Sequence, residues 1–597
     1  MNVAALEVVK EKLTTFTLTD YFTTLHRILN TVDLHSLRPL NIFVLRSYTA
    51  ETMQPILQLR LILEGYNPTF FWGDFNQFVQ EIFDESSRLY SCAPDLILWL
   101  IRIEELLPRF IDNYGVISAD VWSKEFKNLG DQFANLIDVL SKKTSAQILL
   151  QNLDTTLPYW GIYDAQNSFG QKSFVQEFNR ELSSIVANYP NIFIWDFAEF
   201  AAVEGKSNLY DAKQLYTTAN PFKQTAYILI ANDLMRYVVS IFGKIKKCIV
   251  LDLDNTLWGG VIGEDGMEGI ALGHDYPGNC YVALQKELLK LYNRGIILAI
   301  NSKNNESDAF AAIDEHPYMV LKRQHFAAYQ INWNDKVSNL KMLAQELNIG
   351  LDSMIFIDDN VVECELVKQH IPDCTVIQVP QEPYLIPKIV LTMPYIENIR
   401  LTKEDKEKGV MYQAQVARKK LQRTTTDLVA FLNSLDMQIE IKAANNFSIP
   451  RISQLTQKTN QLNMTTRRYT EADILAFSNS SEVKVFSIAV KDRFGDNGIV
   501  GVLILRFFAQ RCTIDSFLLS CRVVERTIEQ SMLAFAAEYA QKNGATTMVG
   551  EFFPSAKNVL AQDIYIKLGM TKIDENTFTV DLAEKTLAYS PHIKLIS

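Results

Sequence analysis

The chain is 597 residues long, which predicts more than one domain, because a single hydrophobic core stops growing at roughly 250–300 residues. Hydrophobic residues make up 48% of the sequence and charged residues 21%, values typical of folded rather than disordered protein. The net charge of −11 disfavours nucleic acid as the main ligand, because neutralising its phosphates requires a basic surface.

The seven cysteines are scattered, and no two of them form a CxxC pair. This distribution is neither a disulfide framework nor a zinc site, and it fits a reducing compartment. The first residues, MNVAALEVVKEKLTTF, lack the apolar core of a signal peptide. Since no apolar run approaches the roughly 18 residues of a membrane span, we expect a cytoplasmic protein with no membrane partner.

Residues 1–243 alternate short apolar segments with helical stretches such as SFVQEFNRELSSIVANY. The apolar segments lie at 41–45, 94–101, 146–153 and 191–197. Strands that alternate with helices indicate a doubly wound parallel sheet with helices on both faces.

Residues 244–395 form a second α/β unit, in which three buried strands each run into a polar cluster. The three segments are KKCIVLDLDNT, GIILAINSKNN and SMIFIDDNVVE. Ligands of open α/β sheets bind at the carboxyl ends of the strands, so we expect these polar groups to converge on one site.

Residues 396–434 are charged and predict a helical linker. In residues 435–597 the predicted strands are QIEIKAA, VKVFSIAVKDRF, IVGVLILRFF and RCTIDSFLLSCRVV, and a helix (ERTIEQSMLAFAAEYAQKNG), a strand (TTMVGEFF) and a second helix follow. This order predicts a mixed α+β domain, so the whole chain is of the α/β class with three domains.

The second unit carries the residues that phosphoryl chemistry needs. Asp252 and Asp254 stand two apart at the end of a strand, and two close carboxylates suit Mg²⁺, which takes few protein ligands and leaves positions for phosphate. The Ser302 hydroxyl can hold a phosphate oxygen, and Lys336 supplies a positive charge. Two further acidic residues follow the third strand, Asp358 and Asp359.

The chain contains four motifs in order: DxDxT, a Ser after the second strand, a Lys, and a DD after the third strand. This order resembles the four motifs of the haloacid-dehalogenase (HAD) superfamily. The resemblance implies that Asp252 is the nucleophile and that Asp254 is the general acid/base, which also lends its backbone carbonyl to the metal. Asp358 would bind Mg²⁺, with Asp359 in support. The phosphate-binding residues would be Thr256, Ser302, Lys303, Asn304 and Lys336.

Longer stretches are more specific than the superfamily motifs. DLDNTLWGGVIGEDG, HPYMVLKRQHFAAYQINWNDKVSNL, RISQLTQKTNQLNMTTRRY and FLLSCRVVER resemble FkbH-like proteins, and the resemblance covers nearly the whole chain. It implies an SGNH-hydrolase-like domain, a capless Rossmann-like HAD domain and a GNAT-like domain. It also implies that the chain removes phosphate from D-1,3-bisphosphoglycerate and loads glyceryl onto the phosphopantetheine thiol of an acyl carrier protein, for polyketide-type biosynthesis. The short segment between Thr256 and the next strand likewise favours an uncapped site.

The first and second domains depart from this family pattern. No histidine lies between His35 and His274, so a Ser-His hydrolase is excluded although Ser47 stands where an SGNH serine would. We therefore interpret the first domain as a platform or docking module. Val361 replaces a usual proline, a loop change that leaves the acidic residues in place.

The third domain departs where GNAT proteins bind the pyrophosphate of CoA through glycines at a helix start. Here Glu525 and Thr527 occupy the glycine positions, and an acidic side chain repels pyrophosphate. Recognition of a carrier protein's phosphopantetheine arm, with its single phosphate, is the alternative that we favour. Four arginines are candidate contacts for that arm: Arg467, Arg468, Arg522 and Arg526.

Cys521 precedes Arg522, whose charge would favour a thiolate, and we hypothesise that it holds the acyl group as a thioester. The alternative is an inert structural cysteine. Two other functions stay open for the whole chain: a capless Mg²⁺-dependent phosphatase without acyl transfer, and a non-catalytic docking protein for a carrier.

Overall fold

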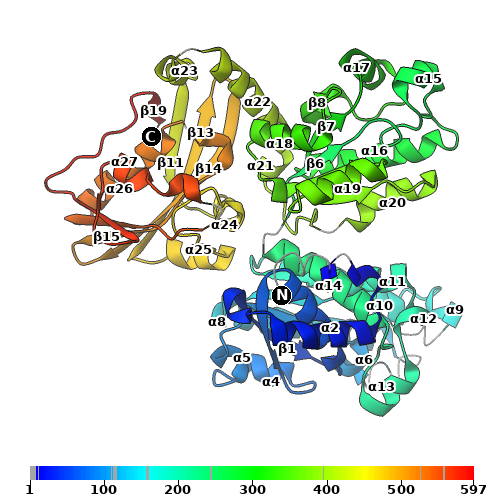
Figure 1. The fold of residues 1–597 in the computed structure, drawn as a ribbon. Helices are drawn as coiled ribbons and strands as arrows, with labels where there is room; N and C mark the ends of the chain where they lie inside the picture. The colour runs from blue at the N-terminus through cyan, green and yellow to red at the C-terminus, as the bar shows by residue number, and fades with distance from the viewer. Residues whose placement is uncertain are drawn as a thin grey trace. The chain divides into compact units, whose positions relative to one another are not determined.

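The computed structural model describes residues 9–10, 12–108, 111, 117–155, 161–242, 245–393, 395–425, 427–524, 526–555 and 558–596. The chain divides into two compact units, Met1–Ile241 and Phe242–Ser597. The first contains one sheet and the second contains two (Figure 1). Within the described ranges, no helix is long and apolar enough to span a membrane.

The sheet of the first unit has five parallel strands in the order β2-β1-β3-β4-β5. The strands are β1 (Arg38–Arg46), β2 (Tyr66–Trp72), β3 (Leu96–Leu100), β4 (Gln147–Gln151) and β5 (Ile192–Trp195). Strands β3 and β4 are buried along their whole length, which explains why their sequences are continuous apolar runs instead of alternating ones. The predicted parallel α/β sheet is present here.

Helices supply the apolar surfaces that cover this sheet. The stacked rings of Trp99 from β3 and Phe133 from α8 lie 5.5 Å apart between centroids, and Phe178 of α10 meets Phe133 edge-on. The helices are α2 (Leu18–Thr31), α3 (Gln54–Leu63), α4 (Phe78–Phe83), α5 (Arg88–Ser91), α6 (Ile103–Leu106), α8 (Ala119–Lys143), α9 (Gly161–Asp164), α10 (Gln171–Val186), α11 (Phe197–Glu204), α12 (Lys206–Leu209), α13 (Ala212–Thr218) and α14 (Ala226–Ile241).

The first sheet of the second unit also has five parallel strands, in the order β10-β9-β6-β7-β8. They are β6 (Cys248–Leu251), β7 (Ile297–Ser302), β8 (Phe326–Ile331), β9 (Met354–Asp358) and β10 (Thr375–Gln378). One face packs against α16 (Gly278–Asn293) and α20 (Ile386–Thr392), and the other against α18 (Lys336–Leu347) and α19 (Val361–His370). Two shorter helices complete this part, α15 (Ile262–Gly269) and α17 (Glu306–Glu315).

Three helices follow where a helical linker was predicted: α21 (Lys403–Lys406), α22 (Lys408–Thr424) and α23 (Leu428–Ser434). They do not form a detached connection. Tyr412 of α22 is buried in the core of the parallel sheet, while α21 and α22 both contact β14 (Gly495–Phe508) of the second sheet. The helices therefore join the two sheets into one compact unit.

The second sheet is mixed, in the order β17-β18-β16-β15-β14-β13-β11-β19, with β12 paired to β15. Its strands are β11 (Met437–Ala443), β12 (Leu462–Asn463), β13 (Val483–Asp492), β14 (Gly495–Phe508), β15 (Arg511–Leu519), β16 (Thr547–Glu551), β17 (Thr571–Lys572), β18 (Thr577–Asp581) and β19 (Ile593–Ile596). Helix α26 (Ile528–Lys542) packs on one face, and α24 (Ile449–Lys458) with α25 (Glu471–Ser478) on the other. A short helix, α27 (Ile564–Lys567), precedes β17.

The sequence pattern overextended one strand of this sheet. Strand β15 ends at Leu519, and Cys521–Val523 form a 3₁₀ turn (η8) where the prediction continued the strand through Val524. Ser520 turns the chain after its backbone N–H donates to Val500, so the apolar run VV does not pair further. Cys521 consequently lies on a turn at the sheet end.

Candidate active site

Three adjacent strands of the parallel sheet deliver polar side chains to one edge. Asp252 directly follows β6, Ser302 ends β7 and Asp358 ends β9, and β6 lies between the other two. Because the strands are parallel, their carboxyl ends meet at the same edge. The convergence expected from the sequence is therefore what the sheet order produces.

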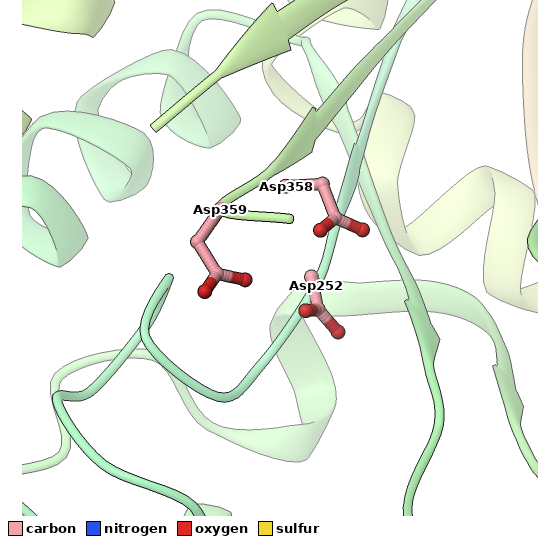
Figure 2. Close-up of side chains that lie close together, drawn as sticks. All are labelled: Asp252, Asp358 and Asp359. Carbon is pink, nitrogen blue, oxygen red and sulfur yellow. The ribbon is translucent and has the colours of Figure 1, made fainter. Parts of the chain in front are cut away.

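The carboxylates of Asp252, Asp358 and Asp359 form a cluster in which one oxygen of each lies within 4.8 Å of the others. Figure 2 shows the three side chains close together, with Asp358 and Asp359 at the end of a strand. Asp252 and Asp358 are buried, where close negative charges repel strongly. A hard cation with oxygen ligands resolves that repulsion, so this donor set fits Mg²⁺.

Lys336, the first residue of α18, supplies fixed positive charge beneath the carboxylates. Its Nζ lies 3.0 Å from an Asp252 oxygen and forms a second ion pair with Asp358. The Asn301 side chain donates to the Lys336 carbonyl at 2.9 Å and so fixes the start of the helix. Lys336 is only 3% exposed, so these pairs are shielded from water.

Burial controls the protonation of these groups. It raises the pKa of Asp252 to about 6, although the charge of Lys336 opposes the shift. Burial raises the pKa of Asp358 and of Asp359 in the same direction. For Lys336, burial alone would lower the pKa, but the charges of Asp252 and Asp358 raise it above its usual value.

Asp254 holds a different position from the three clustered carboxylates. One of its oxygens accepts from the Trp258 indole at 2.9 Å and from the backbone N–H of Ile262 at 3.1 Å, and the other accepts from Asn304 at 2.8 Å. Its carboxylate therefore lies outside the cluster that could hold a metal. This arrangement is compatible with the acid/base role and the carbonyl-mediated metal contact that the HAD resemblance implies.

Of the remaining predicted phosphate-binding residues, Ser302, Asn304 and Thr256 are buried, whereas Lys303 is partly exposed. Ser302 is buried and bonds to Asp252, while Asn304 bridges Ser302 and Asp254. The Thr256 hydroxyl is fully buried and has no hydrogen-bond partner within the described ranges. Lys303 lies farther out and pairs with Glu363 at 2.5 Å.

Between Asp252 and β7 the chain forms only α15 and α16. Tyr281, Leu284 and Leu288 of α16 belong to the core of the sheet, so this helix covers the sheet rather than the site. Helix α15 packs beside α17. No separate cap domain lies in this segment, all of which the structure describes, and this agrees with the uncapped site predicted from its short length.

Cys521 is not part of this cluster. Its carbonyl accepts a 2.5 Å hydrogen bond from Asn348, the residue that follows the last turn of α18, whereas Lys336 begins the same helix at the acidic site. The 12 residues of α18 span about 18 Å, so Cys521 lies near the opposite edge of the parallel sheet. The structure brings Asp252, Ser302 and Lys336 together and keeps Cys521 apart from them.

The four candidate arginines are all engaged by protein groups. Arg467 pairs with Asp515 and Glu551, and Arg468 donates to the carbonyls at the end of α24, including Thr459 at 3.0 Å. Arg526 is buried and pairs with Asp492. Arg522, also buried, donates to the carbonyl of Asn497 at 3.4 Å.

At the altered GNAT position, Glu525 lies outside the described residues. Thr527 precedes α26 with a φ of 60°, and its hydroxyl lies 2.6 Å from that of Ser590. In the first unit, Ser47 is fully buried and its hydroxyl accepts from the backbone N–H of Arg102 at 3.0 Å. A buried serine held in this way fits the structural interpretation of that domain.

Comparisons with known proteins found similarity to one family model and to several solved structures. The sequence model of the family described as FkbH, N-terminal domain, matches residues 45–239. A solved structure of the N-terminal part of BF1531 from Bacteroides fragilis, containing a phosphatase domain complexed with Mg, is 29% identical, with a TM-score of 0.58. It covers 65% of this chain and 100% of that chain. A search of curated proteins found no match.

Two acetyltransferase structures also match over about a quarter of the chain. The ribosomal-protein-S18-alanine N-acetyltransferase from Escherichia coli is 12% identical and covers 26% of this chain and 97% of its own, with a TM-score of 0.20. The spermidine N-acetyltransferase from Vibrio cholerae is 11% identical and covers 24% and 96%, also with a TM-score of 0.20. The chain is thus similar to the FkbH N-terminal domain over residues 45–239 and to the phosphatase-containing part of BF1531 over 65% of its length.

Several site residues have no motif that reveals them in the sequence. Asn301, Asn360 and Trp258 orient Lys336, Asp358 and Asp254 respectively. Only the bond of Asn301 joins residues far apart in the chain, whereas the Trp258 indole and the Asn360 backbone N–H bond to acidic residues of their own motifs. Their only sequence signal is their position, within a few residues of the acidic and serine motifs.

Proposed function

We propose that this protein is a Mg²⁺-dependent phosphatase of the HAD type that acts on a phosphorylated three-carbon acyl donor. The observation that carries the proposal is the cluster of Asp252, Asp358 and Asp359 with Lys336 beside it. Bound there, Mg²⁺ would screen the phosphate charge so that a carboxylate can approach phosphorus. Asp252, Asp358 and Asp359 would hold the ion, and Ser302 with Lys336 would orient the phosphoryl group.

We take D-1,3-bisphosphoglycerate as the donor, because the resemblance to FkbH-like proteins implies it. An Asp252 oxygen attacks the phosphorus of the C3 phosphate, and the bond between phosphorus and the C3 oxygen breaks. Asp254 gives that leaving oxygen its proton, and water then hydrolyses the aspartyl-phosphate to release inorganic phosphate. The open site leaves space for a donor that is presented by a larger partner.

The second half of the proposal is glyceryl transfer to the phosphopantetheine thiol of an acyl carrier protein. A thiolate attacks the C1 acyl carbon, the carbon–sulfur bond forms, and the C1 phosphate leaves with the bonding electron pair. No oxidant or reductant is needed. Cys521 is our candidate for holding the glyceryl group as a thioester before the carrier thiol takes it.

A phosphatase without acyl transfer is the second candidate, and the position of Cys521 favours it. Because α18 separates Cys521 from Lys336 by about 18 Å, a glyceryl group at Asp252 cannot pass to that thiol directly. Acyl transfer therefore requires the donor to bind twice, or a mobile carrier arm to reach the acidic site.

One assay separates the two candidates. The full chain is incubated with D-1,3-bisphosphoglycerate, Mg²⁺ and a holo-carrier protein, and both proteins are then weighed by mass spectrometry. A glyceryl adduct on the carrier, absent without enzyme, supports transfer, whereas phosphate release without an adduct favours the phosphatase. Cys521→Ala tests the thioester: undiminished loading by this variant would exclude Cys521, while Asp252→Asn should abolish removal of the C3 phosphate.

A further inference from the structure

The second unit contains a group of basic side chains that the phosphoryl site does not use. We call it the junction cluster, because it lies where the parallel sheet, α22 and the mixed sheet meet. Its members come from segments far apart in the sequence: the approach to β6, the start of α22, helix α24 and η8. They are Lys247, Lys408, Arg451, Lys458 and Arg522.

Hydrogen bonds link the cluster mainly to neutral groups. Lys247 donates to the Lys458 carbonyl at 3.4 Å, and Lys458 donates to the Asn398 side chain at 3.2 Å. Arg451 donates to the Ile499 carbonyl at 3.1 Å. The Lys408 side chain forms no hydrogen bond or ion pair with any residue in the described ranges. The five positive charges are therefore not individually neutralised by ion pairs.

Two carboxylates lie close to the cluster. Asp405 accepts from Gln454 at 2.6 Å, and Glu404 accepts from the backbone N–H of Ile499 at 3.4 Å. Two negative charges against five positive ones leave an excess of positive charge at a protein junction. Repulsion between positive charges that are partly buried together destabilises the folded protein unless a bound anion compensates it.

The protonation of the lysines reflects this excess. Burial and the neighbouring positive charge of Lys458 lower the pKa of Lys408 to about 7. Burial likewise lowers the pKa of Lys458 to about 8. The pKa of Asp405 falls to about 2 despite burial, because the positive charges of Lys458 and Lys408 stabilise its carboxylate.

Unpartnered polar atoms give an independent indication of a ligand. Asn497 is fully buried, yet neither its amide nitrogen nor its amide oxygen has a partner among the described residues. Its backbone carbonyl accepts from Arg522, whose own Nε is buried and unpartnered within the same ranges. Buried polar groups in native proteins are nearly always hydrogen-bonded. We therefore expect a ligand to supply the missing partners of these atoms.

We propose that the junction cluster is a second anion site, which binds the phosphate group of a small phosphate ester. Lys408, Arg451 and Arg522 would contact the phosphate, and Asn497 would bond to a neighbouring polar group of the ester. Lys247, Lys408, Lys458 and Cys521 all keep partial exposure, so solvent reaches part of the cluster.

The site is separate from the acidic cluster. Lys247 precedes β6 and Asp252 follows it, so about 16 Å of extended chain lies between them. Cys521 is adjacent to Arg522 in the chain and its sulfur lies 3.8 Å from the Tyr412 hydroxyl. A phosphate bound by Arg522 would therefore lie one residue along the chain from that thiol. Two esters have the required chemistry, a pantetheine phosphate and a phosphoglycerate; this choice of ligands rests on the proposed function, whereas the anion site itself does not.

Calorimetric titration of the full chain in EDTA tests the proposal, because metal removal disfavours phosphate binding at the acidic site. The probes are inorganic phosphate, 4′-phosphopantetheine and 3-phosphoglycerate, titrated separately. We expect saturable binding of at least one probe, weakened by about tenfold or more in Lys408→Met and in Arg522→Met. Tighter binding of one ester than of the other identifies which of the two the site recognises.

Lys406→Met is the matched control, because Lys406 is exposed and lies two residues from Lys408. This variant and Asp252→Asn should both bind the probes as the wild type does. Thermal unfolding guards against a folding defect: removing the repelled charge of Lys408 should not lower the melting temperature in phosphate-free buffer, but it should remove the rise that the ligand causes. No saturable binding, or equal binding by Lys408→Met, overturns the anion site. Loss of binding in Asp252→Asn would assign it to the acidic site instead.

Discussion

Lys336 balances two buried carboxylates with a single charge. It pairs with Asp252 at 3.0 Å and also with Asp358, and all three side chains are nearly inaccessible to water. Breaking a buried ion pair by removing one partner leaves an uncompensated charge, which costs far more than losing a surface pair. The residue therefore affects stability as well as phosphate orientation.

We predict that Lys336→Met lowers the free energy of unfolding of the second unit by about 3–5 kcal/mol in EDTA. Added Mg²⁺ should recover part of the loss, because the cation replaces the missing positive charge. Thermal and urea unfolding with and without Mg²⁺ measure both effects. Lys303→Met is the control, since the partly exposed pair of Lys303 with Glu363 should contribute no more than about 1 kcal/mol. Equal losses in the two variants would contradict this charge balance.

The acidic residues should differ in how they respond to metal. Asp252→Asn removes the nucleophile, and we expect phosphate release to fall by about 10⁴-fold or more at any Mg²⁺ concentration. Asp359→Asn removes only a metal ligand, so its loss should be largely recovered by raising Mg²⁺. Initial rates across a Mg²⁺ titration distinguish the two patterns, with circular dichroism confirming that both variants fold. Recovery of Asp252→Asn by metal would exclude it as the nucleophile.

At the scale of elements, the turn from α16 into β7 has little freedom. Gly295 has a φ of 89°, and a Cβ added there would lie 2.3 Å from the Asp405 carbonyl oxygen. Both the left-handed backbone and the close approach exclude a side chain. The turn thus fixes β7 against α21, the helix that carries Asp405.

We predict that Gly295→Ala destabilises the second unit more than Gly544→Ala does. Gly544 has a similar φ of 84°, but a Cβ added there meets nothing within 4 Å. The Gly544 variant should lose about 1 kcal/mol from backbone strain alone. The Gly295 variant should lose at least about 1 kcal/mol more, because a backbone must move. Urea unfolding of both variants measures the difference, and equal values would show that the contact with Asp405 relaxes freely.

Elements with a single clear pattern could be predicted from the sequence. The apolar runs of β6 and β9 end in acidic residues, so both the strands and the placement of Asp252 and Asp358 followed from sequence. Strand β8 (Phe326–Ile331) was not predicted as a strand, because alanines, a tyrosine and a glutamine dilute its apolar pattern. The short edge strand β19 was not predicted either, and it pairs with β11, which lies far away in the chain.

At the scale of the whole molecule, the second unit places opposite charges at opposite edges of one sheet. The acidic cluster lies where β6 and β9 end, and Lys247 of the junction cluster lies just before β6 begins. The acidic edge was predictable because its residues stand in ordered motifs. The basic edge was not, because Lys247, Lys408 and Arg522 are brought together only by the packing of α22 and the mixed sheet.

The junction cluster makes stability depend on pH. Lys408 has a pKa of about 7 in the folded protein, well below that of an unfolded lysine, so between these values the unfolded chain binds more protons. The contribution of Lys408 to stability therefore rises with pH above about 7. We expect the melting temperature of the wild type to rise relative to that of Lys408→Met between pH 7 and pH 9, in phosphate-free buffer. A constant difference between the two would show that Lys408 keeps its ordinary pKa.

Helix α18 has Lys336 at its first position and Asn348 just beyond its last. An α-helix turns by about 100° per residue, so the number of residues between these ends sets their relative direction as well as their separation. Inserting one residue in the helix while Lys336 stays paired with Asp252 would rotate Asn348 away from the Cys521 carbonyl. The number of residues in α18 therefore sets the relative direction of its two ends. A substitution keeps that direction, whereas an insertion or deletion changes it.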